Sequence, residues 1–275
     1  MRRVERQGVL IAYEVIGQGP AIVLLHSFLC SGLMWRHQVD ALAAQNRVIN
    51  IDCRGHGASS PVTCAFTLYD MVDDVLAVLD AEGTRRAIWA GLSVGGMIAL
   101  RAALHAPDRV SALVLADTDA GSESVWRRLK YFALGRVASV AGIRPLLPQV
   151  ARQMFGRTTR RVNRHLVAEW IDHFSQVDVR SALWMLRALK ERDDLTPRLG
   201  DINVPTLVLV GAEDQSLPPR RSRRLADALP RAELIVISQA GHLSSLEQPA
   251  AVTKAMVEFL DGKHHRVRYL RQPFE

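Results

Sequence analysis

A serine between two glycines, in the pentapeptide 91–95, separates two apolar runs of different character. Residues 87–90 are typical of a buried strand, and residues 96–104 have the pattern of an apolar helix. A Gly-x-Ser-x-Gly sequence in this context predicts a sharp strand-to-helix turn, because glycines let the two backbones approach closely. Such a turn presents the Ser93 hydroxyl at the edge of a sheet and beside a helix N-terminus, where negative charge is favoured. We therefore predict that Ser93 is a nucleophile.

Two further polar residues follow apolar runs in the second half of the chain. Asp214 comes shortly after the run 206–210, and His242 comes shortly after the run 234–237. The carboxyl ends of parallel strands form the edge at which α/β sheets place their sites. A serine hydroxyl becomes a good nucleophile when a histidine takes its proton and a carboxylate orients that histidine. The three residues are therefore predicted to form a catalytic triad.

The acid of this triad has two rivals. Asp117 also follows an apolar run, and Asp119 lies two residues further on. Asp214 is preferred because it closes a Gly-x-x-Asp turn, the commoner arrangement after a strand. Two other histidines, His26 and His56, lie in turns that contain serine or glycine, where hydrogen bonds to the backbone are expected of them.

Several segments carry a resemblance to a known family. They are residues 22–28, 52–59, 91–95, 211–214 and 241–242, with a closer likeness at 70–75, Met97 and 114–118. The chain resembles the α/β-hydrolase superfamily over about residues 4–260, and within it the 3-oxoadipate enol-lactonases and small carboxylesterases. The order Ser, Asp, His along the chain is also that of α/β-hydrolases.

The resemblance implies an oxyanion hole made of two backbone N–H groups. One belongs to Val94, the residue after the nucleophile. The other is implied to be that of Phe28, in the loop after the third strand. This loop departs from the family pattern, because His26 is followed by Ser27 where glycine is usual.

The alternation of strand and helix patterns predicts an α/β fold with a mostly parallel sheet flanked by helices. By resemblance the sheet has eight strands, and a helical cap is inserted after the sixth. The chain of 275 residues, 48% of them apolar, is long enough for one such domain. We predict a core formed by residues 1–121 and 199–262, a cap at 122–198 and a basic tail at 263–275.

The cap is predicted from apolar residues at helical spacing and from the lack of β-branched runs. It is expected to cover Ser93, exclude water and shape the substrate pocket. Trp126, Trp184 and Met185 are the expected substrate contacts. The alternative is that these side chains belong to the core of the cap.

The net charge of +7 is concentrated in the cap, where residues 122–198 contain fifteen basic and seven acidic side chains. A basic cap could attract an anionic ester or lactone, or an acidic carrier protein holding an acyl ester. The preferred alternative is that these charged side chains only lie on helix faces exposed to solvent. Nucleic-acid binding is not expected, because the sequence has no recognised module for it.

Neither a metal nor a cofactor is expected, since no pair of histidines has ligand spacing. The three cysteines have no redox or metal-binding spacing, which suits a cytoplasmic protein. The longest apolar runs are too short to cross a bilayer, so a membrane partner is not expected either. The oligomeric state is left open.

These features predict a serine hydrolase that cleaves a small carboxylic ester or a lactone through an acyl-enzyme. The same triad could also hydrolyse a carbon–carbon bond of a β-diketone or perform cofactor-free perhydrolase chemistry. A hydrolase-derived receptor with little turnover is the alternative from another functional class.

Overall fold

The computed structural model describes residues 1–262, and the predicted basic tail at 263–275 lies outside the described residues. Within this range no helix combines the length and apolar character that a bilayer crossing needs. The elements, in chain order, are β1 (Arg2–Arg6), β2 (Val9–Ile16), β3 (Ala21–Leu25), α1 (Val39–Ala43), β4 (Arg47–Ile51), α2 (Leu68–Ala81), β5 (Ala87–Leu92), α3 (Val94–His105), β6 (Val110–Ala116), α4 (Val125–Ala141), α5 (Leu147–Met154), α6 (Arg157–Val162), α7 (Arg164–Ser175), α8 (Val179–Glu191), β7 (Thr206–Gly211), α9 (Pro219–Ala228), β8 (Ala232–Ile237), α10 (Ser244–Glu247) and α11 (Pro249–Leu260).

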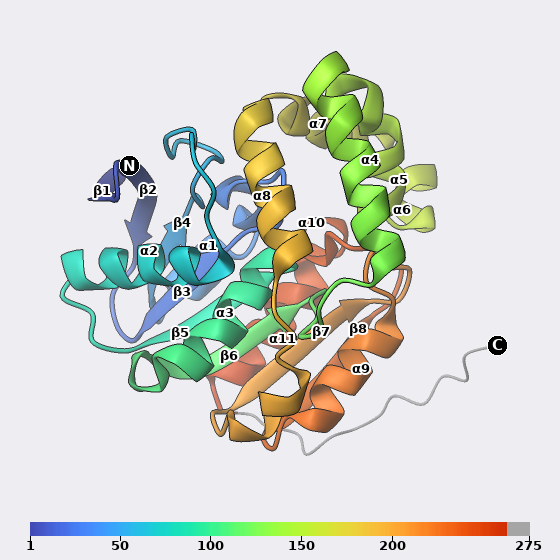
Figure 1. Ribbon diagram of the computed structural model, residues 1–275. Helices are drawn as coiled ribbons and strands as arrows, with labels where there is room; N and C mark the ends of the chain where they lie inside the picture. The colour runs from blue at the N-terminus through green and yellow to red at the C-terminus, as the bar shows by residue number, and fades with distance from the viewer. Residues whose placement is uncertain (263–275) are drawn as a thin grey trace.

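The described strands form one eight-stranded sheet in the order β1-β2-β4-β3-β5-β6-β7-β8 (Figure 1). β2 runs antiparallel to both of its neighbours, while β4, β3, β5, β6, β7 and β8 are mutually parallel. The prediction of a mostly parallel sheet is therefore confirmed. Because the carboxyl ends of β5, β7 and β8 share one edge, the loops that follow them meet there.

Helices cover both faces of the sheet, as expected for buried parallel strands. The alternation of side chains along β3 shows this directly. Ile22 and Leu24 belong to an apolar cluster with residues of α1 and α11, such as Val39 and Met256. Val23 belongs to the opposite cluster, which includes residues of α2, α3 and α9. The sheet is thus the central layer of three.

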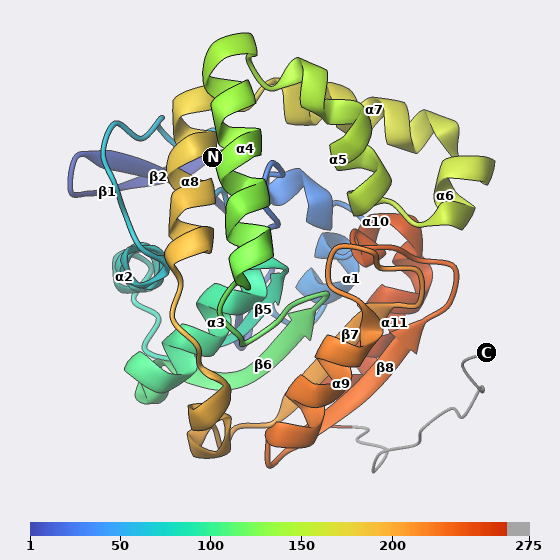
Figure 2. The same ribbon diagram turned by 45° about the vertical axis from the view of Figure 1, so that its right-hand side comes forward.

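Five helices, α4 to α8, are inserted between β6 and β7 and lie over the carboxyl edge of the sheet (Figures 1 and 2). The predicted helical insertion after the sixth strand is confirmed. Trp170 and Phe174 of α7 are buried and join the same apolar cluster as α11, so the insertion packs on the core. The limits 122–198 remain a prediction.

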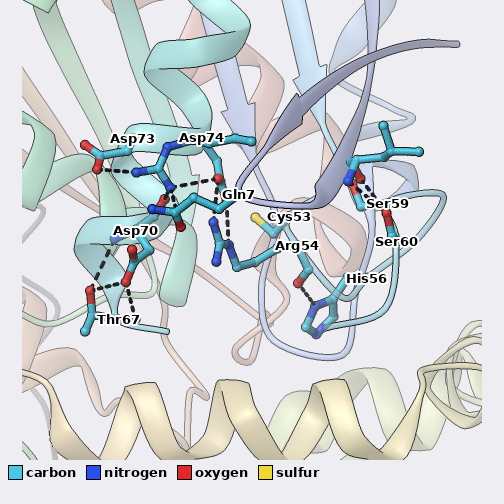
Figure 3. Close-up of polar contacts among 12 residues, drawn as sticks. Gln7, Cys53, Arg54, His56, Ser59, Ser60, Thr67, Asp70, Asp73 and Asp74 are labelled. Atoms are coloured by element: carbon cyan, nitrogen blue, oxygen red, sulfur yellow. Dashed lines mark hydrogen bonds and ion pairs between the residues drawn. The ribbon is translucent and has the colours of Figure 1, made fainter. Parts of the chain in front are cut away.

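The loop after β4 is fixed by a buried ion pair with α2, which Figure 3 shows. Arg54 donates to both carboxylate oxygens of Asp74 at 2.6 Å, and both side chains are buried. Arg6 of β1 donates to Asp73 of the same helix at 2.7 Å. A charge pair taken out of water is tolerated where geometry and hydrogen bonds compensate for the lost hydration. This pairing holds the loop that carries His56 beneath the cap.

Candidate active site

Ser93 lies on a strained turn between β5 and α3. Its backbone has φ 56° and ψ −114°, in a region that non-glycine residues rarely adopt. The turn is held by two hydrogen bonds: the Ser93 N–H donates to the Ala116 carbonyl at 2.9 Å, and the Thr118 hydroxyl donates to the Ser93 carbonyl at 2.6 Å. The predicted strand-to-helix turn is confirmed, and α3 begins at the next residue.

The two glycines of the pentapeptide are required by close backbone contacts. A Cβ atom on Gly91 would lie 2.1 Å from the carbonyl carbon of Gly95. A Cβ atom on Gly95 would lie 2.3 Å from the carbonyl oxygen of Leu25 in β3. Since both obstacles are backbone atoms, neither can rotate away. The glycines therefore let α3 start directly against the sheet.

The structure brings Ser93, His242 and Asp214 together in one chain of hydrogen bonds. His242 Nδ1 lies 2.8 Å from Asp214 Oδ2, and His242 Nε2 lies 2.9 Å from Ser93 Oγ. An ionised carboxylate can only accept, so the imidazole proton is on Nδ1 and the serine hydroxyl donates to Nε2. In this arrangement the imidazole can take the serine proton when Oγ attacks an electrophile.

Backbone groups hold the other two members of this chain of hydrogen bonds in place. The second oxygen of Asp214 accepts from the N–H groups of Ser216 and Leu217 at 2.7 and 2.9 Å. The His242 N–H donates to the carbonyl of Met154, at the end of the cap helix α5. The position of the imidazole therefore depends on the cap as well as on the loop after β8.

Glu247 ties the histidine loop to the cap. One of its oxygens accepts from the N–H groups of Gly241 and Leu243 at 2.9 and 3.2 Å, and the other accepts from Gly156 at 2.8 Å. Burial raises the pKa of this carboxyl, while Thr159 and the backbone N–H groups lower it; the net shift is upward. The sequence analysis missed Glu247, although it is the only acidic residue in the otherwise uncharged stretch 243–253.

The two alternative acids, Asp117 and Asp119, bond other residues than His242. Asp117 is fully buried, and its carboxylate accepts from the Gly211 N–H at 2.7 Å and from the Ser244 hydroxyl. Burial, together with the nearby charge of Asp214, raises the pKa of Asp117 well above its ordinary range. Asp119 pairs with Arg221. Of the three candidates, only Asp214 is hydrogen-bonded to His242 among the described contacts.

His26 and His56 hydrogen-bond the backbone, as predicted. His26 Nδ1 donates to the Ser27 carbonyl at 2.7 Å, and Nε2 accepts from the Cys53 N–H at 2.9 Å. His56 Nδ1 lies 3.1 Å from the Arg54 carbonyl. Burial lowers the pKa of His26 to about 4 and that of His56 to about 3. Both rings are therefore neutral at physiological pH.

The ionisation of His242 reflects two opposing influences. Burial disfavours the imidazolium, but the charge and hydrogen bond of Asp214, with help from Asp117 and Glu247, outweigh it. The pKa of His242 is consequently raised above its ordinary value of 6.5. The same interactions stabilise the imidazolium that forms when His242 takes the serine proton.

This shift predicts the acid limb of the pH profile. If neutral His242 is the base, kcat/KM for an ester should fall about tenfold per pH unit below its pKa. We expect the midpoint of this limb above pH 6.5, because the pKa is raised. The measurement is kcat/KM between pH 5 and 9, and a midpoint below 6.5 would contradict the assignment.

A control must separate titration of the base from unfolding in acid. Below about pH 6.5 the unfolded chain takes up protons on its histidines, whereas His26 and His56 stay neutral in the folded protein. The free energy of unfolding therefore falls as the pH falls. Circular dichroism at each pH shows whether the protein is still folded where activity is lost.

The two residues expected to form the oxyanion hole come from the start of α3 and from the loop after β3. Val94 is the first residue of α3, next to Ser93. Phe28 lies in the loop after β3, half-buried, with its ring edge-on to His56 at a centroid distance of 6.0 Å. That their N–H groups bind an oxyanion remains a prediction.

A cavity of about 130 Å³ lies among the cap helices, and Ser93, His242 and Asp214 are not among the residues that line it. It borders the site through Phe28, through Met154, which accepts from His242, and through Ser216, which donates to Asp214. The remainder of its lining is almost entirely apolar and comes from Leu29, Tyr131, Leu134, Ala138, Ile143, Leu146, Val150, Gln153, Ala182, Leu183, Leu186 and Leu189.

The expected substrate contacts lie outside this lining. Trp126 is 81% exposed on the outer side of α4. Trp184 is half-buried, with the Arg187 guanidinium 5.6 Å from its ring centroid. Met185 is fully buried in the apolar cluster that also includes residues of α2, α3 and α9. Helical spacing marked all three as cap residues, but the direction that each faces depends on how α4 and α8 pack together.

Comparison with known proteins agrees with this architecture. Residues 20–249 match the family model described as alpha/beta hydrolase fold. The 3-oxoadipate enol-lactonase 2 of Acinetobacter baylyi is 28% identical over 254 residues, which cover 91% of this chain and 92% of that protein. The pimeloyl-[acyl-carrier protein] methyl ester esterase of Vibrio atlanticus is 31% identical, with coverage of 90% and 96%.

Solved structures give the same result. A thermophilic esterase from Thermogutta terrifontis superposes with a TM-score of 0.91 at 29% identity, covering 96% of this chain and all of that one. The relatives thus include esterases and enol-lactonases, the branch that the sequence resembled. The chain belongs to the alpha/beta hydrolase fold family.

Proposed function

We propose that this protein hydrolyses a small carboxylic ester or lactone through a serine-bound acyl intermediate. The observation that carries the proposal is the continuous chain of hydrogen bonds from Ser93 Oγ through His242 to Asp214. The similarity to esterases and enol-lactonases supports the same reaction class.

Each residue has a defined role in the proposed reaction. Ser93 Oγ attacks the carbonyl carbon while its proton passes to His242 Nε2, and Asp214 stabilises the imidazolium. The N–H groups of Val94 and Phe28 stabilise the oxyanion. The alcohol leaves with the proton from His242. Water then gives a proton to His242 and attacks the acyl carbon, which releases the carboxylic acid and restores Ser93.

The cavity lining favours an apolar acyl group over an anionic one. Its polar members are few, chiefly Gln153, Tyr131 and Ser216, and among residues 1–262 no arginine or lysine lines it. A carboxylate placed there would lose its hydration without gaining a cationic partner. The basic residues of the cap are therefore not proposed to bind the acyl group of the substrate.

The size of the cavity predicts an optimum in acyl length. Its apolar walls enclose only about 130 Å³, so a short aliphatic chain should fit and a long one should not. We expect kcat/KM for p-nitrophenyl esters to rise from acetyl to about hexanoyl and to fall for long chains. Leu134→Trp, on the cavity side of α4, should lower kcat/KM for hexanoate at least about tenfold and spare acetate.

The matched control is Leu129→Trp, because Leu129 lies on the exposed side of the same helix. It should leave the chain-length profile unchanged. Equal effects of the two variants, or a flat profile in the wild-type protein, would contradict an acyl pocket at this cavity.

The function itself is tested by turnover on a panel of esters, lactones, β-diketones and peracid precursors. The proposal expects many turnovers per protein molecule on esters or lactones, and labelling of Ser93 by a fluorophosphonate. A receptor would release about one equivalent of product and then stop. Preferred turnover of β-diketones or peracids would overturn the ester or lactone assignment and favour another reaction of the same site.

A further inference from the structure

Helix α4 exposes an apolar face to solvent over its whole length. Its outward residues are 43–82% exposed, and they are Val125, Trp126, Leu129, Phe132, Val137 and Val140. At 3.6 residues per turn these side chains share one arc of about 140°. The opposite side of the helix, with Tyr131, Leu134 and Ala138, lines the cavity. No residue of α4 is fully buried, so the outer face has no partner within the described chain.

The charged residues of α4 itself have one sign. α4 contains four basic residues and no acidic residue between Val125 and Ala141. Arg127 turns inward, where it pairs with Glu123 at 3.0 Å. Arg128, Lys130 and Arg136 are exposed beside or within the apolar arc. A surface that complements this helix must therefore be both apolar and anionic.

A groove beside the face has the same character. It has a volume of about 260 Å³ and lies between α4 and α8, which contact each other and lie side by side in Figure 2. Arg136 of α4 and Arg187 and Lys190 of α8 line it, together with the ring of Phe132. Glu191 contacts Arg187 at 3.1 Å and Lys190 at 4.0 Å and offsets part of this charge. The groove thus offers cations next to apolar side chains.

We propose that the outer face of α4 docks onto an anionic lipid surface. Helices with aromatic and aliphatic residues on one side and flanking lysines and arginines lie in the interface of bilayers in this way. The apolar arc enters the acyl region, and the basic residues of α4 and the groove contact lipid phosphates. This differs from the sequence-based expectation of no membrane partner. That expectation concerned spanning segments, whereas docking needs only an exposed face.

Two other partners for the outer face of α4, a second copy of the chain and an acidic protein, fit the observations less well. A second copy, paired face to face, would bring Arg128, Lys130 and Arg136 against the same residues without any acid on α4 to balance them. An acidic protein would satisfy the charges, but it would also need a surface that matches the shape of the whole helix face. A fluid bilayer accepts an apolar arc without such a match.

If the proposed function holds, docking has a direct consequence for the reaction. The outer face and the cavity are two sides of one helix, whose diameter is about 10 Å. An apolar ester dissolved in the lipid would then be held close to the cavity.

The test is cosedimentation of the full-length protein with vesicles. One set contains phosphatidylglycerol and phosphatidylcholine, and the other contains phosphatidylcholine alone. We expect binding to the anionic set, weakened by 0.5 M salt, and a blue shift of the emission that Trp126→Phe abolishes. The triple variant Val125→Ser, Leu129→Ser, Phe132→Ser should reduce the bound fraction at least about tenfold.

The matched control replaces two exposed apolar residues outside α4, Leu33→Ser and Val162→Ser, and should bind as the wild type does. Circular dichroism and ester turnover without vesicles establish that the variants fold. Equal binding to both vesicle sets, or unchanged binding of the triple variant, would overturn the proposal. So would a wild-type dimer that the triple variant dissociates, or binding to an acidic protein without binding to vesicles. Ser93→Ala should bind vesicles normally, so docking is tested independently of hydrolysis.

Discussion

The variant Ser93→Ala is expected to lose ester turnover by about 10⁵- to 10⁶-fold while keeping its fold. Removing the nucleophile of a serine hydrolase leaves only the contribution of binding and oxyanion stabilisation. The Ser93 side chain contacts His242 at 2.9 Å, and its loss opens little space. The turn itself is held by backbone atoms, since the Ser93 N–H and carbonyl make the hydrogen bonds that fix it. The far-ultraviolet circular dichroism and melting temperature should therefore stay close to those of the wild type.

The measurement is steady-state turnover of p-nitrophenyl butyrate, with product release followed for hours in the variant. Ser139→Ala provides a matched control, because this serine is exposed on α4 and its hydroxyl only donates to a carbonyl of its own helix. Loss of fluorophosphonate labelling in Ser93→Ala, but not in Ser139→Ala, would show that the labelled residue is Ser93. Retained turnover in a folded Ser93→Ala protein would exclude Ser93 as the nucleophile.

The second prediction with a large effect tests whether Asp214 or Asp117 is the acid that orients His242. Asp214→Asn should reduce kcat by about 10⁴-fold, because an amide facing His242 Nδ1 favours the imidazole tautomer with its proton on Nε2. Nε2 could then no longer accept the Ser93 proton. The backbone N–H groups of Ser216 and Leu217 can still bond the asparagine carbonyl oxygen, so the fold should survive.

Asp117→Asn is the matched control, because Asp117 is equally buried and close to the same histidine. Its carbonyl oxygen can accept from Gly211, and its amide can donate to the hydroxyl of Ser244. Because the described hydrogen bonds of Asp117 go to Gly211 and Ser244 and not to His242, its replacement should change kcat by less than about tenfold. If Asp117→Asn lost more activity than Asp214→Asn, the assignment of the acid would be reversed.

Local patterns predicted much of the site from sequence. The turn at Ser93 is dictated by short-range sterics, since Gly91 and Gly95 avoid backbone contacts of 2.1 and 2.3 Å. Asp214 and His242 follow strands whose apolar runs are visible in the sequence, and parallel strands end at one edge. Residue type and strand position therefore suffice to predict that these three residues converge. They do not suffice to give the partners of Asp117, which depend on the loops after β7 and β8.

The cap shows where sequence patterns stop being informative. Periodicity identified its helices, but a 3.6-residue period says only which residues share a face and not which neighbour that face meets. Periodicity therefore does not show that the Trp126 side chain is 81% exposed. The cavity lining, from Leu134 and Ile143 to Leu186, arises where α4, α5 and α8 meet. Glu247 likewise accepts hydrogen bonds from Gly241, in its own loop, and from Gly156, which is 91 residues away along the chain.

The sequence by itself determined the order of strands and helices, the turn at Ser93 and the identity of the residues that meet there. These properties follow from local sterics and from the alternation of apolar runs. Only the tertiary structure decided which acid bonds His242, which side chains line the cavity of the cap, and that α4 leaves an apolar, basic face in solvent. Such contacts depend on the packing of elements distant in sequence, and packing is set by the whole chain at once.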